Sequence, residues 1–339
     1  MRYRIFCHGS ENKVTVHKEG VLVAGESTLF PAAVIPAYAY AVAVAVSALL
    51  GFCAIVITAR RKGMKASTGP VFFVLAVVLG VFLARLFYCL ARFEYVFYEM
   101  GISYLFAFDQ FGYTLAGAVT GCLLAGFLTA RVTRQSTAAV LDAAVSGGAM
   151  TLALARLAEG LTQQGIGALV EDERLQFFPL SVQTMYGDWA YAVYMLEFIA
   201  ALVLAVVTWR FLMKKDQPAG KTTYLFLLLF GASQVLLESL RQDEYLRWGF
   251  VRVVQLFSMG LLLVSARYFL ARAQKDGPKR ISILARGTCI LLGIGVCVLV
   301  EFALDKSPIP NWLLHSMMAG VLAMMVWAAL PRSGKAIKE

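Results

Sequence analysis

Charged residues are scarce in this sequence. They make up 15% of its 339 residues, whereas an ordinary globular domain has about a quarter. Hydrophobic residues reach 60%, and the mean hydropathy is +0.71. Because a helix crosses a bilayer with roughly 20 mostly apolar residues, the chain has material for seven to nine spans. These values exclude a soluble domain and a single-anchor protein, and they predict an all-α, polytopic bundle of membrane helices.

Patterns typical of metal sites and disulfide frameworks are also missing. The three histidines, His8, His17 and His315, are too scattered for a metal cage, and the six cysteines form no CxxC pair. We therefore expect no metal and no organic cofactor. The excess of 31 Lys and Arg over 21 Asp and Glu would suggest a nucleic-acid partner in a soluble protein. Here it predicts basic cytoplasmic loops and no nucleic acid.

The first 29 residues are polar and lack the apolar core of a cleavable signal peptide. We interpret residues 1–29 as a surface arm that could form a small hairpin. A polar loop at about 160–186 divides the apolar remainder of the chain. Nine spans are predicted, at about 30–59, 68–91, 105–130, 137–158, 187–212, 222–240, 249–271, 283–304 and 311–330.

Basic residues favour one orientation of these spans. The first span is followed directly by Arg60, Arg61 and Lys62. If this cluster is cytoplasmic, alternation over nine spans places most of the Lys and Arg residues on the same side. The bias predicts that the N-terminus faces outward.

Ionisable residues in spans cost about 2.5–3.5 kcal/mol each to insert, so they are candidates for functional sites. Two pairs at helical spacing stand out, Arg156 with Glu159 and Glu238 with Arg241. Arg156 and Glu159 could simply neutralise each other, but they run into a loop rich in Gly and Gln, typical of a polar cavity mouth. The second pair is either structural or a phosphate site, for which the guanidinium fork is suited. Each pair has a glutamine on its helical face: Gln163 and Gln234.

Three other features lie in apolar surroundings. Arg85 and Tyr88 share one helical face, and Arg85 is either functional or reaches towards the membrane interface. Glu197 stands alone in an apolar span and is interpreted as a protonated or hydrogen-bonded packing residue. Close helix packing is predicted by small residues at a spacing of four: Gly117, Gly121 and Ala125.

The order of these segments resembles the prolipoprotein diacylglyceryl transferase family over about residues 36–264. IPAYAYAVAVAVSALLGF resembles its first span, and GVFLARLFYCL its Gly-Ala-Arg-Leu-x-Tyr segment. LARLAEGLTQQGIG is similar to its Gly-Arg-x-Gly-Asn signature, LLESLRQDEY to its Phe-x-x-Glu-Phe-x-Arg element, and VVQLFSMGLLL to its Gly-Gln-x-x-Ser-x-Pro segment. The resemblance implies catalytic roles for Arg156, Glu159, Glu238 and Arg241. It implies substrate binding by Tyr38, Arg85, Tyr88, Gln163, Gly167, Gln234, Gln255 and Ser258.

The chain departs from the family's pattern at several of these positions. Ala116 stands where the family has a histidine, and Gln234 where it has an arginine. In the signature, Glu159 replaces an asparagine and Gln164 a glutamate. Two spans follow the family's seven, so we expect a seven-span transferase-like unit at 30–272 and an added pair with a basic tail at 273–339.

The resemblance implies transfer of a diacylglyceryl group from phosphatidylglycerol to a lipobox cysteine thiol. The implied partners are phosphatidylglycerol, the prolipoprotein signal-peptide region and the lipid bilayer, in the bacterial cytoplasmic (inner) membrane. Arginines would hold the leaving phosphate. Without the histidine, Glu159 or Glu238 is the evident base for the thiol.

Two other functions are compatible with the sequence. One is a non-catalytic relative that binds lipids or lipoproteins, and the other is a small-molecule transporter. The chain has no two-fold internal similarity, which argues against transport. Charges gathered near one leaflet would favour the lipid functions, whereas a polar path from face to face would favour transport.

Overall fold

The computed structural model describes residues 25–26, 34–35, 38–108, 112–162, 164–184, 186–214, 217–242, 246–248, 250–275 and 280–330. Within these residues, nine helices are long and apolar enough to cross a membrane. They are α1 (Ala39–Arg61), α2 (Thr68–Ala91), α4 (Leu115–Thr133), α5 (Thr137–Ala158), α6 (Val193–Leu212), α7 (Lys221–Leu240), α8 (Val253–Lys275), α9 (Arg280–Lys306) and α10 (Asn311–Ala329). The predicted all-α, polytopic bundle with nine spans is confirmed, and the protein is a multi-pass membrane protein.

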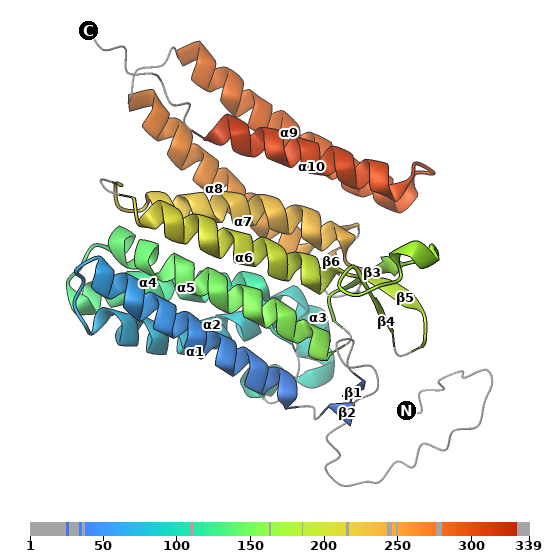
Figure 1. The fold of residues 1–339 in the computed structure, drawn as a ribbon, viewed down its shortest axis with the longest axis horizontal. Coiled ribbons are helices and arrows are strands. Elements are labelled where there is room, and N and C mark those ends of the chain that lie inside the picture. Colours follow the sequence, from blue (N-terminus) through green and yellow to red (C-terminus); the bar gives the residue numbers. More distant parts are fainter. Residues whose placement is uncertain are drawn as a thin grey trace.

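The helices run roughly along one direction in successive tiers (Figure 1). α1 and α2 lie at one flank, α9 and α10 at the opposite flank, and α6 and α7 between them. The short strands gather at one end of the bundle (Figure 1). Lipid-facing side chains such as Val42, Val78 and Leu299 are exposed, as expected for helices whose outer surface meets hydrocarbon.

Three predicted span starts are wrong: those of the first, third and fifth spans. The fifth span begins at Val193 and not at about residue 187, because Trp189–Ala192 forms a strand. The first helix begins at Ala39, and Val34–Ile35 (β2) instead pairs antiparallel with Gly25–Glu26 (β1). Pro36 precedes the helix in the sequence, and proline is excluded from a helix interior. Most of the predicted N-terminal arm, residues 1–24 and 27–29, lies outside the described residues, as does the tail after residue 330.

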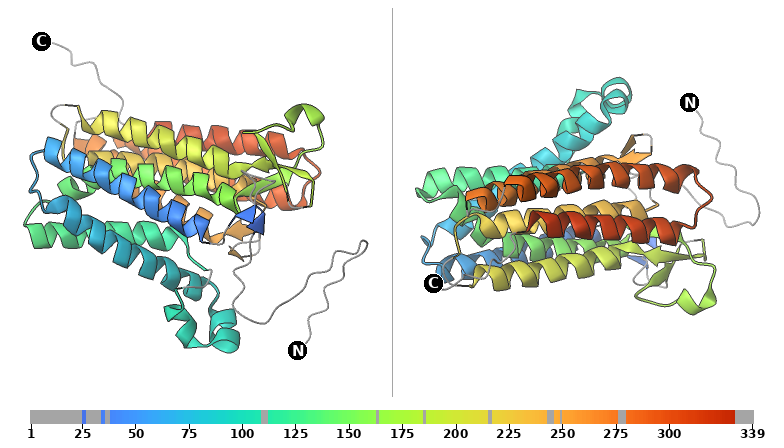
Figure 2. Two further views of the ribbon diagram at one scale, coloured as in Figure 1. Left: turned by 60° about the horizontal axis from the view of Figure 1, so that its bottom comes forward. Right: turned by 90° about the horizontal axis from the view of Figure 1, so that it is seen from above.

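The third span begins at Leu115 and not at residue 105, because the preceding residues form a separate arm. This arm consists of α3 (Phe93–Tyr95), η1 (Val96–Met100) and η2 (Ile102–Phe106), and it projects from the bundle (Figure 2). Gly101 and Gly112 have φ angles of 78° and 117°. Such positive values interrupt an α-helix on both sides of η2.

Glycines allow the backbones of α2 and α4 to pack directly against each other. A Cβ atom on Gly117 would lie 2.2 Å from the Leu83 carbonyl oxygen, and one on Gly121 would lie 2.6 Å from the Gly80 Cα. Ala125, one turn further, is fully buried. The predicted close packing along these small residues is therefore confirmed.

The polar loop at about 160–186, together with the first residues of the predicted fifth span, forms a small antiparallel sheet. Its strands are β3 (Ile166–Leu169), β4 (Ser181–Gln183) and β5 (Trp189–Ala192), in the order β3-β5-β4. Two short 3-10 turns, η3 (Glu159–Leu161) and η4 (Glu173–Leu175), precede β3 and β4. Strand β3 also pairs with the end of α7, through a bridge between Gly167 and Arg241. The sheet is thus fastened to the ends of two spans.

The two C-terminal helices pack on α7 and α8. Their shared core includes Val235 and Leu262 on the inner side and Val300 and Met318 on α9 and α10. Between α8 and the end of α7 lies a hairpin of β6 (Arg247–Trp248) and β7 (Val251–Arg252). The added pair therefore contacts the same end of the bundle that carries the sheet.

Candidate functional site

Six ionisable side chains gather where the ends of α5, α6, α7 and β7 meet. We call this set the charge cluster: Arg156, Glu159, Glu197, Glu238, Arg241 and Arg252. Each side chain is less than 10% exposed. Ionised groups are stable at such depth only when they are paired and hydrogen-bonded.

Two arginines converge on the same carboxylates. Arg156 Nη1 donates to Glu159 Oε1 and lies 3.4 Å from Glu197 Oε2. Arg241 Nη1 lies 3.2 Å from Glu159 Oε2 and 3.0 Å from Glu197 Oε2. Both predicted pairs are therefore joined into one network across three helices.

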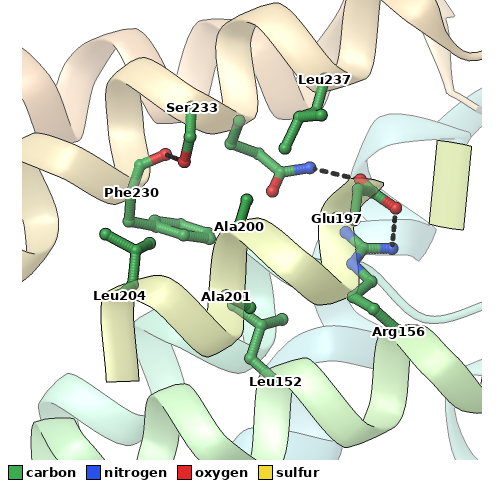
Figure 3. Close-up of a pocket in the computed structure, with 10 residues that line it drawn as sticks. Leu152, Arg156, Glu197, Ala200, Ala201, Leu204, Phe230, Ser233 and Leu237 are labelled. Atoms are coloured by element: carbon green, nitrogen blue, oxygen red, sulfur yellow. Dashed lines mark hydrogen bonds and ion pairs between the residues drawn. The ribbon is translucent and has the colours of Figure 1, made fainter. Parts of the chain in front are cut away.

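Glu197 occupies the centre of this network (Figure 3). The sequence interpretation of Glu197 as a packing residue left it out of the site. Its carboxylate also accepts a hydrogen bond from Gln234 Nε2 at 2.9 Å. One indication in the sequence of a role for Glu197 in the site was its position in an otherwise apolar span.

Gln234 connects the centre of the cluster to its second half. The same Gln234 Nε2 donates to Glu238 Oε2 at 3.2 Å. Glu238 Oε1 lies 3.8 Å from Arg252 Nη1, and Arg252 Nη2 donates to the Arg241 carbonyl at 2.6 Å. Arg252 carried no recognisable signal in the sequence, because it follows a turn and belongs to no helical pair.

Two glycines shape the backbone beside the cluster. Gly165 has a φ angle of 69°, and a Cβ there would lie 2.8 Å from Glu159 Oε2. A Cβ on Gly167 would lie 2.8 Å from Val193 Cγ2 and 3.0 Å from the Leu240 carbonyl. Gly167 therefore lets strand β3 approach the end of α7 and position Arg241 through the backbone.

The cluster contains three guanidinium groups and three carboxylates, so its formal charges balance. An incoming anion would have to replace a carboxylate at one of the arginines. The point between Arg156 and Arg241, where Glu197 Oε2 now lies, is where both guanidinium groups converge. Planar, bidentate guanidinium groups match phosphate oxygens as well as carboxylates.

A small pocket opens beside this point (Figure 3). Its polar lining comes from Arg156, Glu197, Ser233 and Gln234, and its apolar lining includes Leu152, Ala200, Leu204, Phe230 and Leu237. The interior has room for about one water molecule. The pocket is therefore smaller than any organic ligand.

The two tyrosines at the start of α1 differ in their surroundings. Tyr38, the predicted substrate-binding residue, is 58% exposed. Tyr40 is partly buried, and its hydroxyl group lies within the electrostatic influence of Glu159, Arg156 and Arg241. The structure therefore brings Tyr40 to the cluster, and its spacing of two from Tyr38 is the sequence signal that was missed.

Gln255 and Ser258, the remaining predicted residues of α8, are both buried. Gln255 is buried, and its Oε1 accepts a hydrogen bond from the Arg252 backbone N–H at 2.9 Å. Ser258 packs against α7, where a Cβ on Gly231 would meet its carbonyl at 2.6 Å. The predicted Gln163 lies outside the described residues.

Arg85 and Tyr88 are joined to the projecting arm. Arg85 is fully buried and donates to the carbonyls of Tyr104, Ala107 and Gly112, at 2.8, 2.9 and 3.2 Å. Its guanidinium also lies 4.0 Å from the centre of the Tyr104 ring. Tyr88 packs beside Cys89 and Tyr104. These contacts make Arg85 the anchor of the arm.

Residues 27–271 match the model of the prolipoprotein diacylglyceryl transferase family. The chain belongs to this family. The match includes α1 to α7 and nearly all of α8, with the complete charge cluster, and it ends before α9 and α10.

Similar members of the transferase family come from Bacillus and Clostridium species. The phosphatidylglycerol–prolipoprotein diacylglyceryl transferases of Bacillus cytotoxicus and Bacillus cereus are each 24% identical over 242 residues, which are 70% of this chain and 88% of theirs. The enzyme of the same name from Clostridium novyi is 23% identical over 195 residues, 57% of this chain and 74% of its own. The resemblance drawn from the motifs is thus confirmed at the level of the family, and with it the transferase class.

Proposed function

We propose that this protein transfers a diacylglyceryl group from phosphatidylglycerol to a cysteine thiol. The acceptor is the lipobox cysteine in the signal-peptide region of a prolipoprotein. The observation that carries the proposal is the convergence of Arg156 and Arg241 on one buried anion position, at 3.4 and 3.0 Å from Glu197 Oε2. This position lies inside the segment that matches the transferase family.

The phosphate of the lipid is the group that this position suits. A phosphodiester carries one negative charge, and the released phosphate monoester carries more. Fixed guanidinium groups in a water-poor site stabilise such developing charge more than water does. Arg156 and Arg241 therefore act as phosphate-binding residues. The carboxylate of Glu197 occupies the anion position between them until the lipid phosphate enters.

The reaction balances with the groups present. The cysteine sulfur forms a bond to the glyceryl carbon, and the bond from that carbon to the phosphate oxygen breaks. Glycerol phosphate leaves with the electron pair. The thiol proton passes to Glu159 or Glu238 and from there to the leaving phosphate, because a thiol with an ordinary pKa near 8.5 needs a base to react as thiolate.

The orientation of the protein in the membrane follows from the same proposal. The end of the bundle that carries the sheet faces the periplasm, where prolipoproteins are presented, and the N-terminus lies outside the inner membrane. The seven-span unit at 30–272 then carries the chemistry, and the loop at about 160–186 lies on the periplasmic side. A transporter is disfavoured because Arg156, Glu159, Glu238 and Arg241 meet at one end of the spans.

The proposal is tested with purified protein, phosphatidylglycerol vesicles and a lipobox peptide. Mass spectrometry should detect a thioether-linked diacylglyceryl peptide, which disappears for the Arg156→Ala variant. Arg174→Ala, an exposed arginine of the sheet region, is the matched control and should retain full transfer. Folded wild-type protein that binds phosphatidylglycerol but forms no adduct would instead identify a non-catalytic, lipid-binding member of the family.

A further inference from the structure

Basic residues gather at the end of the bundle opposite the charge cluster. α1 and α6 both end there, on either side of α5 (Figure 1). Four exposed basic residues mark these two helix ends: Arg60, Arg61, Lys62 and Arg210. The sequence of α1 contains no carboxylate, and Glu197, the single carboxylate of α6, belongs to the charge cluster at the other end. The positive charge of this end is therefore not balanced within the two helices.

A buried carboxylate near the start of α5, Asp142, is already occupied by α7. Its Oδ2 accepts a hydrogen bond from the Gly220 N–H at 2.7 Å. Its Oδ1 accepts bonds from the N–H and the hydroxyl of Thr223, at 2.7 and 2.6 Å. Asp142 thereby caps the start of α7, and the exposed basic residues on α1 and α6 remain accessible to an anion from outside the protein.

Arg61 reaches from α1 to the exposed indole ring at the end of α6. Its guanidinium carbon lies 5.8 Å from the centre of the Trp209 ring, and Arg210 follows Trp209 in the chain. Trp209 is 41% exposed. Exposed tryptophans are typical of the level in a membrane where the acyl chains meet the headgroups. We call Arg61, Trp209 and Arg210 the basic seam, because these three residues connect the ends of the two helices.

Apolar side chains continue from the basic seam towards the middle of the membrane. Ile57, one turn before Arg61, is 51% exposed. Val206 and Val203, one and two turns before Arg210, are 43% and 54% exposed. Residues at these spacings share a helix face with the arginine that follows them. The surface therefore changes from positive to aromatic to apolar, in the same order as the phosphate, the glycerol and the acyl chains of a phospholipid.

We propose that the basic seam binds an anionic phospholipid of the leaflet opposite the charge cluster. Arg61 and Arg210 hold the headgroup phosphate, Trp209 contacts the glycerol region, and the acyl chains lie along the apolar faces of α1 and α6. Each basic residue near anionic lipid contributes about a fivefold preference, so the two arginines predict roughly a 5- to 25-fold preference over a zwitterionic lipid. The site is separate from the charge cluster, and the inference does not rest on the proposed function.

Quenching of Trp209 fluorescence by brominated lipids tests the proposal at the site itself. The Trp209 signal is the difference between the full-length protein and its Trp209→Phe variant. In mixed bilayers with either phosphatidylglycerol or phosphatidylcholine brominated, the wild type should show the preference for phosphatidylglycerol. The double variant Arg61→Gln with Arg210→Gln should lower the preference to about one, whereas lysine at both positions should keep most of it.

Two single variants serve as controls. Arg131→Gln removes an exposed basic residue at the same end of α4, whose guanidinium lies 4.9 Å from the Phe127 ring, and it should leave the preference unchanged. Arg156→Ala should also leave it unchanged, because Arg156 lies in the charge cluster at the other end. Loss of the preference in Arg156→Ala would place the lipid in the charge cluster and would overturn the proposal.

Equal quenching of Trp209 by both brominated lipids would overturn the proposal from the wild type alone, even if the glutamine variant fails to fold. An unchanged preference in a folded glutamine variant would also overturn it. Free phosphate offers the same chemistry as the headgroup. If inorganic phosphate abolishes the preference and chloride at equal ionic strength does not, the basic seam binds a free anion and the lipid is overturned. None of these results depends on whether the protein forms a thioether product.

Discussion

Arg241 and Glu197 lie 44 positions apart in the sequence, yet Arg241 Nη1 and Glu197 Oε2 are 3.0 Å apart. Arg241 is the C-cap of α7, and Glu197 lies in the second turn of α6. The contact joins the two antiparallel spans at their shared end. It also makes each residue dependent on the other, because an unpaired charge at this depth is strongly destabilising.

The first prediction concerns the geometry of Arg241. In Arg241→Lys the charge remains, but a flexible ammonium lacks the rigid, planar guanidinium fork, whose Nη1 contacts both Glu159 and Glu197. We expect transfer to fall about 100-fold, in the range found when one charge-stabilising donor is removed. Thioether formation on a lipobox peptide measures this, and near wild-type activity in Arg241→Lys would contradict a role for the fork.

The second prediction concerns the charge balance of the cluster. Glu197→Gln keeps the shape of the side chain but leaves three arginines against two carboxylates. Glycerol phosphate, the anionic product, should then bind several-fold more tightly, because a phosphate competes with one carboxylate fewer. The inhibition constant for glycerol phosphate measures the change. Glu173→Gln, which alters an exposed carboxylate of the sheet region, should leave that constant unchanged.

The third prediction separates backbone strain from contact with the site. Gly165 and Gly187 both have positive φ angles, 69° and 89°. An alanine at either position should cost about 1–2 kcal/mol of stability from strain. Only at Gly165 would the new Cβ meet Glu159, at 2.8 Å, whereas Gly187 has no atom within 4 Å. Gly165→Ala should therefore lose transfer activity in a way that Gly187→Ala does not, with Tm measured for both.

The fourth prediction concerns the arm. Arg85→Ala removes the donor for three carbonyls of the segment that links α2 to α4. Each hydrogen bond to a charged group contributes about 1.5–3 kcal/mol, so the arm should loosen while the spans persist. Hydrogen exchange of residues 96–106 should accelerate at least tenfold. Arg92→Ala, an exposed neighbour at the same helix end, is the control, and equal exchange in both variants would contradict the anchoring role.

Hydropathy was sufficient to predict the number and type of the spans, because each exceeds the length that hydrocarbon requires. It could not reveal where helices stop at an interface. Leu105 and Phe106 belong to η2 of the arm, and Gly112, with a φ angle of 117°, precedes α4, a conformation that hydropathy does not report. Likewise, the apolar residues Val34 and Ile35 form strand β2 and are not part of the first helix.

The site was partly predictable for a related reason. Arg156 with Glu159 and Glu238 with Arg241 are close in sequence, so helical spacing showed both pairs. Glu197 and Arg252 acquire their partners only through packing between elements that are distant in the sequence, which a single sequence does not show. Arg85 illustrates the opposite case, because the sequence singled out this ionisable residue in a span, whereas its hydrogen bonds go to the segment that links α2 to α4.

The bridge between Gly167 and Arg241 has a mechanical consequence. The backbone that carries Arg241 is also a rung of the sheet outside the spans, reinforced by the hydrogen bond from Gln242 N to the Ile166 carbonyl at 3.0 Å. A tilt of the sheet would therefore displace the backbone of Arg241 directly. The sheet outside the spans and the buried ion pair between Arg241 and Glu197 are thereby mechanically coupled through one stretch of chain.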